Sequence, residues 1–305
     1  MAIIRCKIRR GGQGGSGTAK CSSCGSERQA EQEKKRYEQK HRADIKAFLK
    51  DAIIENGELI RYKGKQKTVY LPRIITRIGD SAFSGCGSLT AVTIPEGVTR
   101  IGDRAFCECE SLTDVTIPEG VTQIGVGAFL MCGSLTAVTV PEGVTQIGAT
   151  AFVACRSLTS ITIPEGVTEI GDYMFRSCRS LTAINIPGSV TRIGDDAFHG
   201  CGALVALTIP EGVTEIGDRA FAFCGSLECI IIPDSVMHIG EDCFRNCGRV
   251  CLMAKPDSCA ARWAAEKNIK WVDRDEEKRC EQHEQTERKN IRDEGKVYSS
   301  IAADN

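Results

Sequence analysis

Apolar positions recur along most of this chain in a unit of 23 residues, which reads LxxVxIPxxVxxIGxxAFxxCxx. In the unit around Val92, the alternation of apolar and polar residues is typical of a short strand. We expect Val92 and Ile94 to face inward. Their neighbours Ala91 and Thr93 should then face outward. The strand should end at Pro95, since proline has no N–H group to donate to a neighbouring strand.

The second half of the unit predicts a return path to the next strand. Ile101 repeats the inward pattern, and Gly102 follows at a corner where we expect a positive φ. Ala105, Phe106 and Cys109 should fill the interior from a short helical turn. One unit cannot bury its apolar side chains, but stacked units form columns, in which the same position recurs in successive turns.

Three residue types mark the period without a single insertion. The prolines are Pro72, Pro95, Pro118, Pro141, Pro164, Pro187, Pro210, Pro233 and Pro256. The phenylalanines are Phe83, Phe106, Phe129, Phe152, Phe175, Phe198, Phe221 and Phe244. The cysteines are Cys86, Cys109, Cys132, Cys155, Cys178, Cys201, Cys224 and Cys247. The period and the LxxVxI opening predict an α/β repeat fold, a right-handed leucine-rich-repeat solenoid with a parallel sheet along one face.

The unit IPEGVTxIGxxAFxxC resembles the BspA-type leucine-rich repeat of bacterial surface proteins, and the resemblance covers residues 57–271. Residues 57–71 look like the N-terminal hairpin of that family. Residues 257–272 look like its C-terminal helix and last strand. The resemblance implies a protein-binding role, often in adhesion, and it implies no catalytic residues.

The regions outside the repeats differ in composition. Residues 1–25 are rich in glycine and cysteine, and we expect them to be flexible. Residues 26–56 read as a charged amphipathic helix, which Asn56 and Gly57 should end. The solenoid and its caps should cover residues 57–272. The remaining residues, 273–305, form a charged tail that we expect to be disordered or a lone helix.

Charge is distributed unevenly, although the formal net charge of the chain is only −1. Residues 1–67 carry 17 Lys and Arg against 8 Asp and Glu, a net charge of +9. No stretch approaches the 18 consecutive apolar residues of a membrane-spanning helix, so we expect no membrane partner. The start of the chain does not resemble a signal peptide, which favours a cytoplasmic location. An exported surface protein is the alternative.

The chain contains 17 cysteines. The cysteine column is explained by packing, because a buried free cysteine behaves as a small apolar side chain. In a cytoplasmic compartment we expect reduced thiols. Cys243 replaces an alanine and should be buried, whereas Cys107 and Cys229 lie in variable columns and should be exposed.

A CxxCG element near the N-terminus is the candidate metal site. Cys21 and Cys24 have the spacing of a zinc knuckle, and Cys6 offers a third ligand, but a structural zinc site needs four. Two knuckles shared across a dimer would supply Cys₄. A flexible segment without metal is the simpler interpretation, so we expect no cofactor.

Catalytic constellations are missing from the sequence. The GxGxxG match at Gly12, Gly14 and Gly17 lacks the βαβ unit that a dinucleotide site needs. His199 and His238 occupy columns that should face solvent. The chain is therefore expected not to be an enzyme, and a small-molecule substrate is not expected.

The outward strand positions form the candidate binding face. They are Thr93, Thr116, Thr139, Thr162, Asn185 and Thr208, with Asp114 and Ser160 beside them. Solenoids use such open faces as binding platforms. Threonine is also simply favoured in strands, so the row has a structural explanation too.

The sequence thus predicts a non-catalytic protein-interaction scaffold. The alternative from another class is a nucleic-acid-associated protein, which would use the basic N-terminal segment and the CxxC knuckle. A cell-surface adhesin and a purely structural spacer are further alternatives.

Overall fold

The computed structural model describes residue 32 and residues 35–275. It divides into two compact units, residues 1–42 and residues 43–305. In the first unit, the described residues are helical over residues 35–40. Within the described ranges, no helix combines the length and the apolar character needed to cross a bilayer. The solenoid described below belongs to the second unit.

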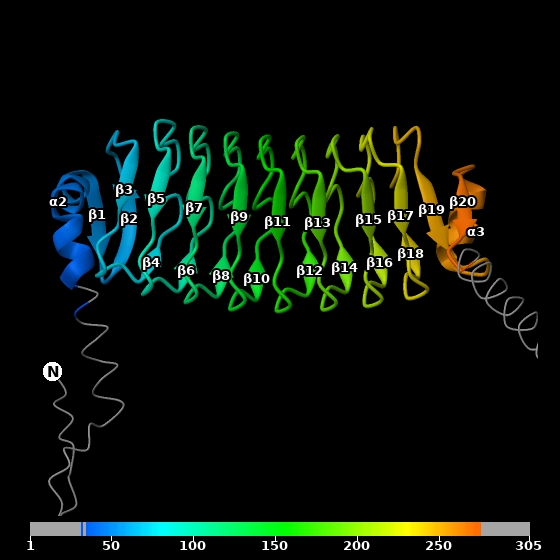
Figure 1. Ribbon diagram of the computed structural model, residues 1–305, viewed down its shortest axis with the longest axis horizontal. Coiled ribbons are helices and arrows are strands. Elements are labelled where there is room, and N and C mark those ends of the chain that lie inside the picture. Colours follow the sequence, from blue (N-terminus) through cyan, green and yellow to red (C-terminus); the bar gives the residue numbers. More distant parts are fainter. Residues whose placement is uncertain (1–31, 33–34, 276–305) are drawn as a thin grey trace, which may run out of the picture. The chain divides into compact units, whose positions relative to one another are not determined.

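Each repeat contributes one longer and one shorter strand to the solenoid. The longer strands are β3 (Thr68–Tyr70), β5 (Ala91–Thr93), β7 (Asp114–Thr116), β9 (Ala137–Thr139), β11 (Ser160–Thr162), β13 (Ala183–Asn185), β15 (Ala206–Thr208), β17 (Cys229–Ile231) and β19 (Cys251–Ala254). The shorter strands are β4 (Arg77–Ile78), β6 (Arg100–Ile101), β8 (Gln123–Ile124), β10 (Gln146–Ile147), β12 (Glu169–Ile170), β14 (Arg192–Ile193), β16 (Glu215–Ile216) and β18 (His238–Ile239). Successive strands of each kind lie side by side along the solenoid (Figure 1).

Strands of each kind pair in parallel with their equivalents in the next turn. Thr93 lies opposite Thr116, for example, and Ile101 lies opposite Ile124. The longer strands form one sheet from β3 to β13 and another from β15 to β20 (Trp271–Asp273). The shorter strands also form two sheets, with the division between β10 and β12. The predicted leucine-rich-repeat solenoid is confirmed.

The phenylalanine column forms the centre of the core. Its rings stack almost parallel from Phe83 to Phe244, with neighbouring centroids 5.0–5.6 Å apart. Each ring from Phe83 to Phe221 is fully buried, which stabilises the fold by about 1.5–3 kcal/mol per side chain. Because every turn supplies one ring, the stack ties successive repeats together.

Two caps close the open ends of the ring stack. At the N-terminal end Phe48 of α2 (Arg42–Asp51) stacks on Tyr62, whose centroid lies 5.4 Å from that of Phe83. At the other end Trp263 of α3 (Cys259–Glu266) contacts Phe244 edge-on at 5.8 Å. The predicted C-terminal helix and last strand are thus present as α3 and β20.

The N-terminal cap differs from the prediction. The helix expected over residues 26–56 ends at Asp51, and β1 (Ala52–Glu55) follows at once. β1 pairs antiparallel with β2 (Glu58–Tyr62), so the hairpin begins earlier than the expected residues 57–71. Asn56 and Gly57 both have positive φ and form its turn instead of ending a helix. Asn-Gly is the pair that a two-residue hairpin turn favours.

Hydrogen bonds from side chains link each turn to the one before. The Thr113 hydroxyl donates to the carbonyl of Thr90 at 3.1 Å, and this bond recurs along the threonine column. The Cys155 thiol donates to the carbonyl of Phe129 at 3.2 Å, and the column repeats this bond from Cys109 to Cys247. The cysteine column therefore packs the core and also supplies hydrogen-bond donors.

The corner glycine has a different role from the one expected. Gly102 does not have a positive φ. A Cβ at Gly102 would lie 2.7 Å from the backbone nitrogen of Asp80, so glycine is required for close approach of two turns. Positive φ occurs instead at Arg104 (52°) and Glu108 (60°), and the same columns repeat it in most other turns.

Candidate functional site

The strand face is the surface made by the outward positions of the longer strands from β5 to β15. The pairing places Thr93, Thr116, Thr139, Thr162 and Asn185 in one row. Along this face the candidate residues are exposed, apart from half-buried Thr93. Asp114 is the only charged residue among these outward positions, and the others are Ala, Thr, Ser or Asn. The face is therefore nearly uncharged and built from small side chains.

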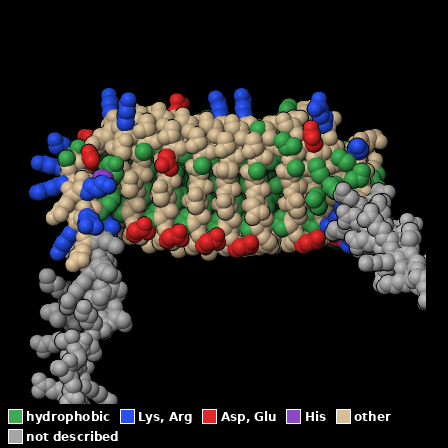
Figure 2. Space-filling view, in the orientation of Figure 1, with side chains coloured by type: hydrophobic (Ala, Val, Ile, Leu, Met, Phe, Trp, Pro, Cys, Tyr) green, Lys and Arg blue, Asp and Glu red, His purple; other side chains and the backbone are tan. Residues whose placement is uncertain are grey.

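Charged residues border this face along its two edges (Figure 2). One edge carries an acidic row in the turns that follow the longer strands. Its members are the exposed residues Glu96, Glu119, Glu142, Glu165 and Glu211. The opposite edge carries the exposed residues Arg156 and Arg179, together with the exposed Glu110 of the same column. A partner on the strand face would thus meet a row of carboxylates on one side and two arginines and one glutamate on the other.

Carboxylates link successive turns beside the shorter strands. Asp103 Oδ1 accepts a hydrogen bond from the N–H of Val126 at 2.9 Å, and Asp172 Oδ1 accepts one from Asp195 at 3.0 Å. Between these two bonds, the same column holds Val126 and Ala149. No carboxylate of this column therefore reaches the N–H groups of Ala149 and Asp172 in the described structure.

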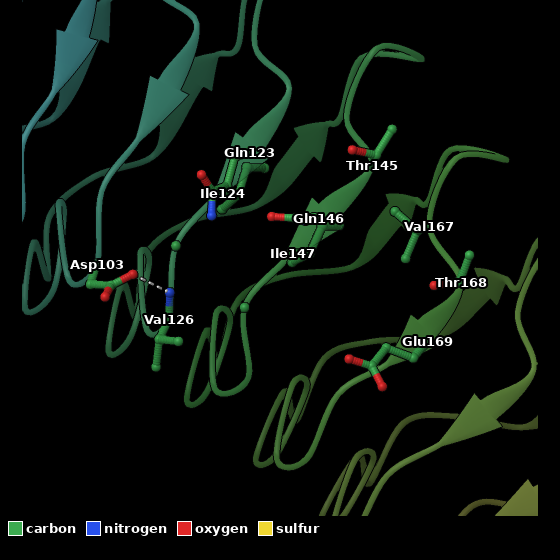
Figure 3. A pocket seen from close by; sticks show the side chains of 12 residues that line it. Asp103, Gln123, Ile124, Val126, Thr145, Gln146, Ile147, Val167, Thr168 and Glu169 are labelled. Carbon is green, nitrogen blue, oxygen red and sulfur yellow. Dashed lines mark hydrogen bonds between the residues drawn. The ribbon is translucent and has the colours of Figure 1, made fainter.

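A depression of about 350 Å³ lies at this interruption (Figure 3). Its lining comes from β8, β10, β12 and adjoining residues. The polar side chains that line it are Asp103, Gln123, Thr145, Gln146, Thr168 and Glu169. No Lys or Arg lines it, and neither of its two carboxylates forms an ion pair with the described residues. The depression is thus acidic and polar.

A buried carboxylate forms a third feature, which sequence reasoning missed. Asp196 is 1% exposed, whereas no other described charged residue is buried. Its Oδ1 accepts a hydrogen bond from Arg176 at 2.7 Å, and its Oδ2 accepts one from Arg219 at 2.9 Å. The two arginines come from the turns before and after, so Asp196 links three turns.

Aromatic rings surround this group, which we call the Asp196 cluster together with Arg176, Arg219 and His199. The guanidinium of Arg176 lies 5.6 Å from the ring centroid of Tyr173. The ring of His199 lies 5.0 Å from that of Phe223, which is 47% exposed. Tyrosine and arginine carry much of the energy in protein interfaces. The cluster is a second candidate contact surface.

The expectation that His199 faces solvent is wrong. Its side chain is 18% exposed, its Nε2 lies 3.9 Å from Asp196 Oδ1, and its buried Nδ1 has no hydrogen-bond partner in the described part of the chain. Burial and the charge of Arg176 lower the pKa of His199, although Asp196 opposes the shift. The lowered pKa favours the neutral imidazole.

The variable cysteines also differ from expectation. Cys107 is 5% exposed and Cys229 is half-buried, so the predicted exposure of both is wrong. Cys229 thus differs from the exposed members of its column, Asp114 to Ala206, and its thiol lies 3.3 Å from Met253 Sδ. Cys243 is fully buried, as predicted.

The candidate metal ligands lie outside the described residues. They are Cys6, Cys21 and Cys24. The glycine-rich segment and the tail beyond residue 275, for which flexibility or disorder was expected, also lie outside the described residues. Over residue 32 and residues 35–275, no group of three or more His, Cys, Asp or Glu is placed to hold a metal ion. Zinc at the CxxC element stays a prediction.

Comparison with known proteins identifies the repeats. The sequence profile of the BspA type leucine rich repeat region matches residues 58–182 and 168–258, with six copies. No curated protein is similar to this chain in sequence.

Among solved structures, the chain is similar to a leucine-rich repeat protein from Bacteroides ovatus, with 30% identity and a TM-score of 0.50. The match covers 62% of this chain and 55% of that protein. A leucine rich cell surface protein from Faecalibacterium prausnitzii is 30% identical over 67% of this chain and 74% of its own, with a TM-score of 0.48. The T. pallidum leucine rich repeat protein is 27% identical over 70% and 89%, with a TM-score of 0.48.

Proposed function

This chain belongs to the BspA-type leucine-rich-repeat family, and from that premise we propose that it is a non-catalytic scaffold that binds a protein partner through its strand face. Stacked repeats give this family a rigid repeat scaffold, because each turn packs only on its neighbours.

The nearly uncharged strand face is the observation that carries this proposal. It presents exposed Ala, Thr, Ser and Asn side chains from β7 to β15, while the outward residues of β5 are half-buried. Ordering small side chains on binding costs little conformational entropy, and burying few charges limits the desolvation cost. The flanking acidic row and the arginine edge would orient the partner, since complementary charges steer association.

Site-specific photocrosslinking tests this proposal on the full-length chain. A photoreactive residue at Ser160 lies on the strand face. The matched control is a photoreactive residue at Glu108, on the side formed by the loops that follow the shorter strands, which we call the loop side. In cells of the source organism, we expect Ser160 to form a covalent adduct with a defined protein and Glu108 to form none. Adducts with nucleic acid, or equal adducts from both positions, would contradict the proposal.

We also propose that the chain works in a reducing compartment. The thirteen described cysteines are free thiols, and most of the cysteine column donates S–H hydrogen bonds to carbonyls. Oxidation would remove those donors. Disulfides are rare in the reducing cytosol, which fits the cytoplasmic location expected from the sequence. Mass spectrometry of protein alkylated during lysis should find every thiol reduced, and native disulfides would contradict this location.

A further inference from the structure

The solenoid opens between two neighbouring turns, at the depression beside the shorter strands. Elsewhere the glycine after a short strand donates its N–H to the turn before, as Gly148 does to the Ile124 carbonyl at 2.8 Å. Within the described structure, Gly171 makes no such bond to Ile147. The short strands β10 and β12 accordingly fall in different sheets.

The threonine column on this side is interrupted at the same place. Thr191 donates to the Thr168 carbonyl with its N–H at 2.9 Å and with its hydroxyl at 3.2 Å. In the described chain, Thr168 donates neither bond to Thr145. The carbonyls of Thr145 and Ile147 therefore receive none of the bonds that their equivalents receive in the adjoining turns.

Met174 explains why the two turns separate. Its column holds alanine in the other turns, except for Cys243 in the last, and Met174 is fully buried. Its methyl carbon would lie 3.6 Å from a Cβ on Gly171. A Cβ on Gly171 would lie 3.6 Å from the backbone nitrogen of Ala149 in the preceding turn, whereas a Cβ on Gly194 would lie only 2.7 Å from that of Asp172. A larger side chain in a packed core displaces backbone, and here it holds the turns apart.

We propose that the gap between β10 and β12, which we call the β10–β12 slot, binds the side chain of an Arg or Lys residue from a partner polypeptide. Glu169 of β12 supplies a carboxylate at this gap, and Asp103 adds a second one at the far end of the depression, two turns before β10. Neither carboxylate has an ion-pair partner among the described residues. The open carbonyls of Thr145 and Ile147 supply further acceptors. A guanidinium or ammonium group carries only donors, so it matches this set.

The neighbouring arginines leave this negative charge uncompensated. Arg100 pairs with Asp80 in the turn before it, at 3.5 Å. Arg192, which lies opposite Glu169 in the next turn, pairs with Asp172 at 3.1 Å and Glu215 at 3.4 Å instead. An anionic ligand would find no cation in the lining, whereas a cationic side chain would find the Glu169 carboxylate at the gap and the negative charge of Asp103 farther along the depression.

This proposal concerns the shorter strands and does not depend on binding at the strand face. Its probe is the capped tripeptide acetyl-Gly-Arg-Gly-amide, titrated into the full-length chain and followed by backbone amide NMR. The matching peptide with glutamate in place of arginine is the control. We expect saturable shifts at the Gly171 and Thr168 amides with the arginine peptide only.

Three variants locate the site. Glu169→Gln should weaken the Kd at least 5-fold by removing a carboxylate. Glu142→Gln, in the acidic row of a neighbouring turn, should leave the Kd unchanged. Met174→Ala restores the residue of the other turns, so it should close the slot and abolish the saturable shifts.

Hydrogen exchange provides a readout that needs no ligand. The Gly171 amide should exchange at least 10-fold faster than the Gly148 amide, and Met174→Ala should remove the difference. Equal exchange of the two amides in the wild type would overturn the slot. Equal affinity for the glutamate peptide, or shifts abolished by Glu142→Gln, would overturn the assigned ligand.

Discussion

Phe152 shows at the scale of one residue why the repeat holds together. Its fully buried ring lies between Phe129 and Phe175, with centroids 5.5 and 5.6 Å away. A side chain in the middle of the stack contacts both neighbouring turns. Its loss therefore leaves a cavity that neither turn can fill without shifting.

Replacing Phe152 by alanine should lower the free energy of unfolding by about 3–5 kcal/mol, through lost burial and the cavity. The matched control is Phe223→Ala, because that phenylalanine is 47% exposed. We expect the control to change stability by about 0.5 kcal/mol or less. Urea unfolding followed by circular dichroism measures both, and similar losses would mean that the inward and outward columns are exchanged.

The cysteine column makes stability depend on alkaline pH. Burial raises the pKa of Cys132 and Cys178 to about 12 and that of Cys155 well above its ordinary value. In the unfolded chain, thiols titrate near pH ~8.5. The unfolded state therefore loses protons first, so the thiols' contribution is complete below pH ~8.5 and falls as pH rises towards 12.

Replacing Cys155 by serine should reduce this alkaline loss. Above pH ~9, each thiol that is removed should reduce the fall of the free energy of unfolding by about 1.4 kcal/mol per pH unit. Serine should itself be tolerated well, because its hydroxyl can donate to the Phe129 carbonyl that the thiol now contacts at 3.2 Å. Urea unfolding at pH 7–10 compares the two proteins. Identical slopes would show that the column thiols are already ionised or exposed in the folded state.

Single residues also show where sequence reasoning stops. The 23-residue period predicted the burial of Val92, Ile101 and Phe106, because an inward side chain repeats in type. It also marked Gly102 as special, but assigned the wrong cause. A glycine required for close approach and one required for positive φ look alike in a sequence. Arg104 takes the positive φ although its side chain gives no sign of it.

At the scale of an element, the repeats differ most in the loops that follow the shorter strands. The strands themselves could be predicted, because their alternation of apolar and polar residues recurs in each turn. The Asp196 cluster could not, since Arg176 and Arg219 lie 20 and 23 residues from their partner and their columns hold unrelated residues elsewhere. The β10–β12 slot could not be predicted either, because it depends on where Val126, Ala149 and Met174 lie relative to one another in three successive turns.

Removing Arg219 tests whether the cluster stabilises its three turns. Arg219→Ala leaves Asp196 buried with one arginine, and Arg219 is 42% exposed, so part of its ion pair is screened by solvent. We expect a loss of about 1 kcal/mol in the free energy of unfolding. Arg245→Ala is the control, since its ion pair with Asp242 is exposed at both partners. Equal losses in the free energy of unfolding for the two variants, measured by urea unfolding, would show that the ion pair with the buried Asp196 stabilises the fold no more than an exposed one.

At the scale of the whole solenoid, one side is nearly uniform and the others vary. Along the strand face the outward columns keep to small side chains over six strands, from β5 to β15. The loop side changes residue type from turn to turn and carries the Asp196 cluster. A repeat protein can vary one surface in this way because each turn depends only on its neighbours for packing.

Binding through the strand face is tested most directly by the Kd for the protein captured at Ser160. Thr139→Arg with Thr162→Arg places two long charged side chains on the face. Glu108→Arg with Met131→Arg does the same on the loop side, where both residues are exposed. The strand-face variant should weaken the Kd at least 10-fold, or about 1.4 kcal/mol, while the loop variant binds like the wild type. An unchanged Kd for the strand-face variant would contradict binding through this face.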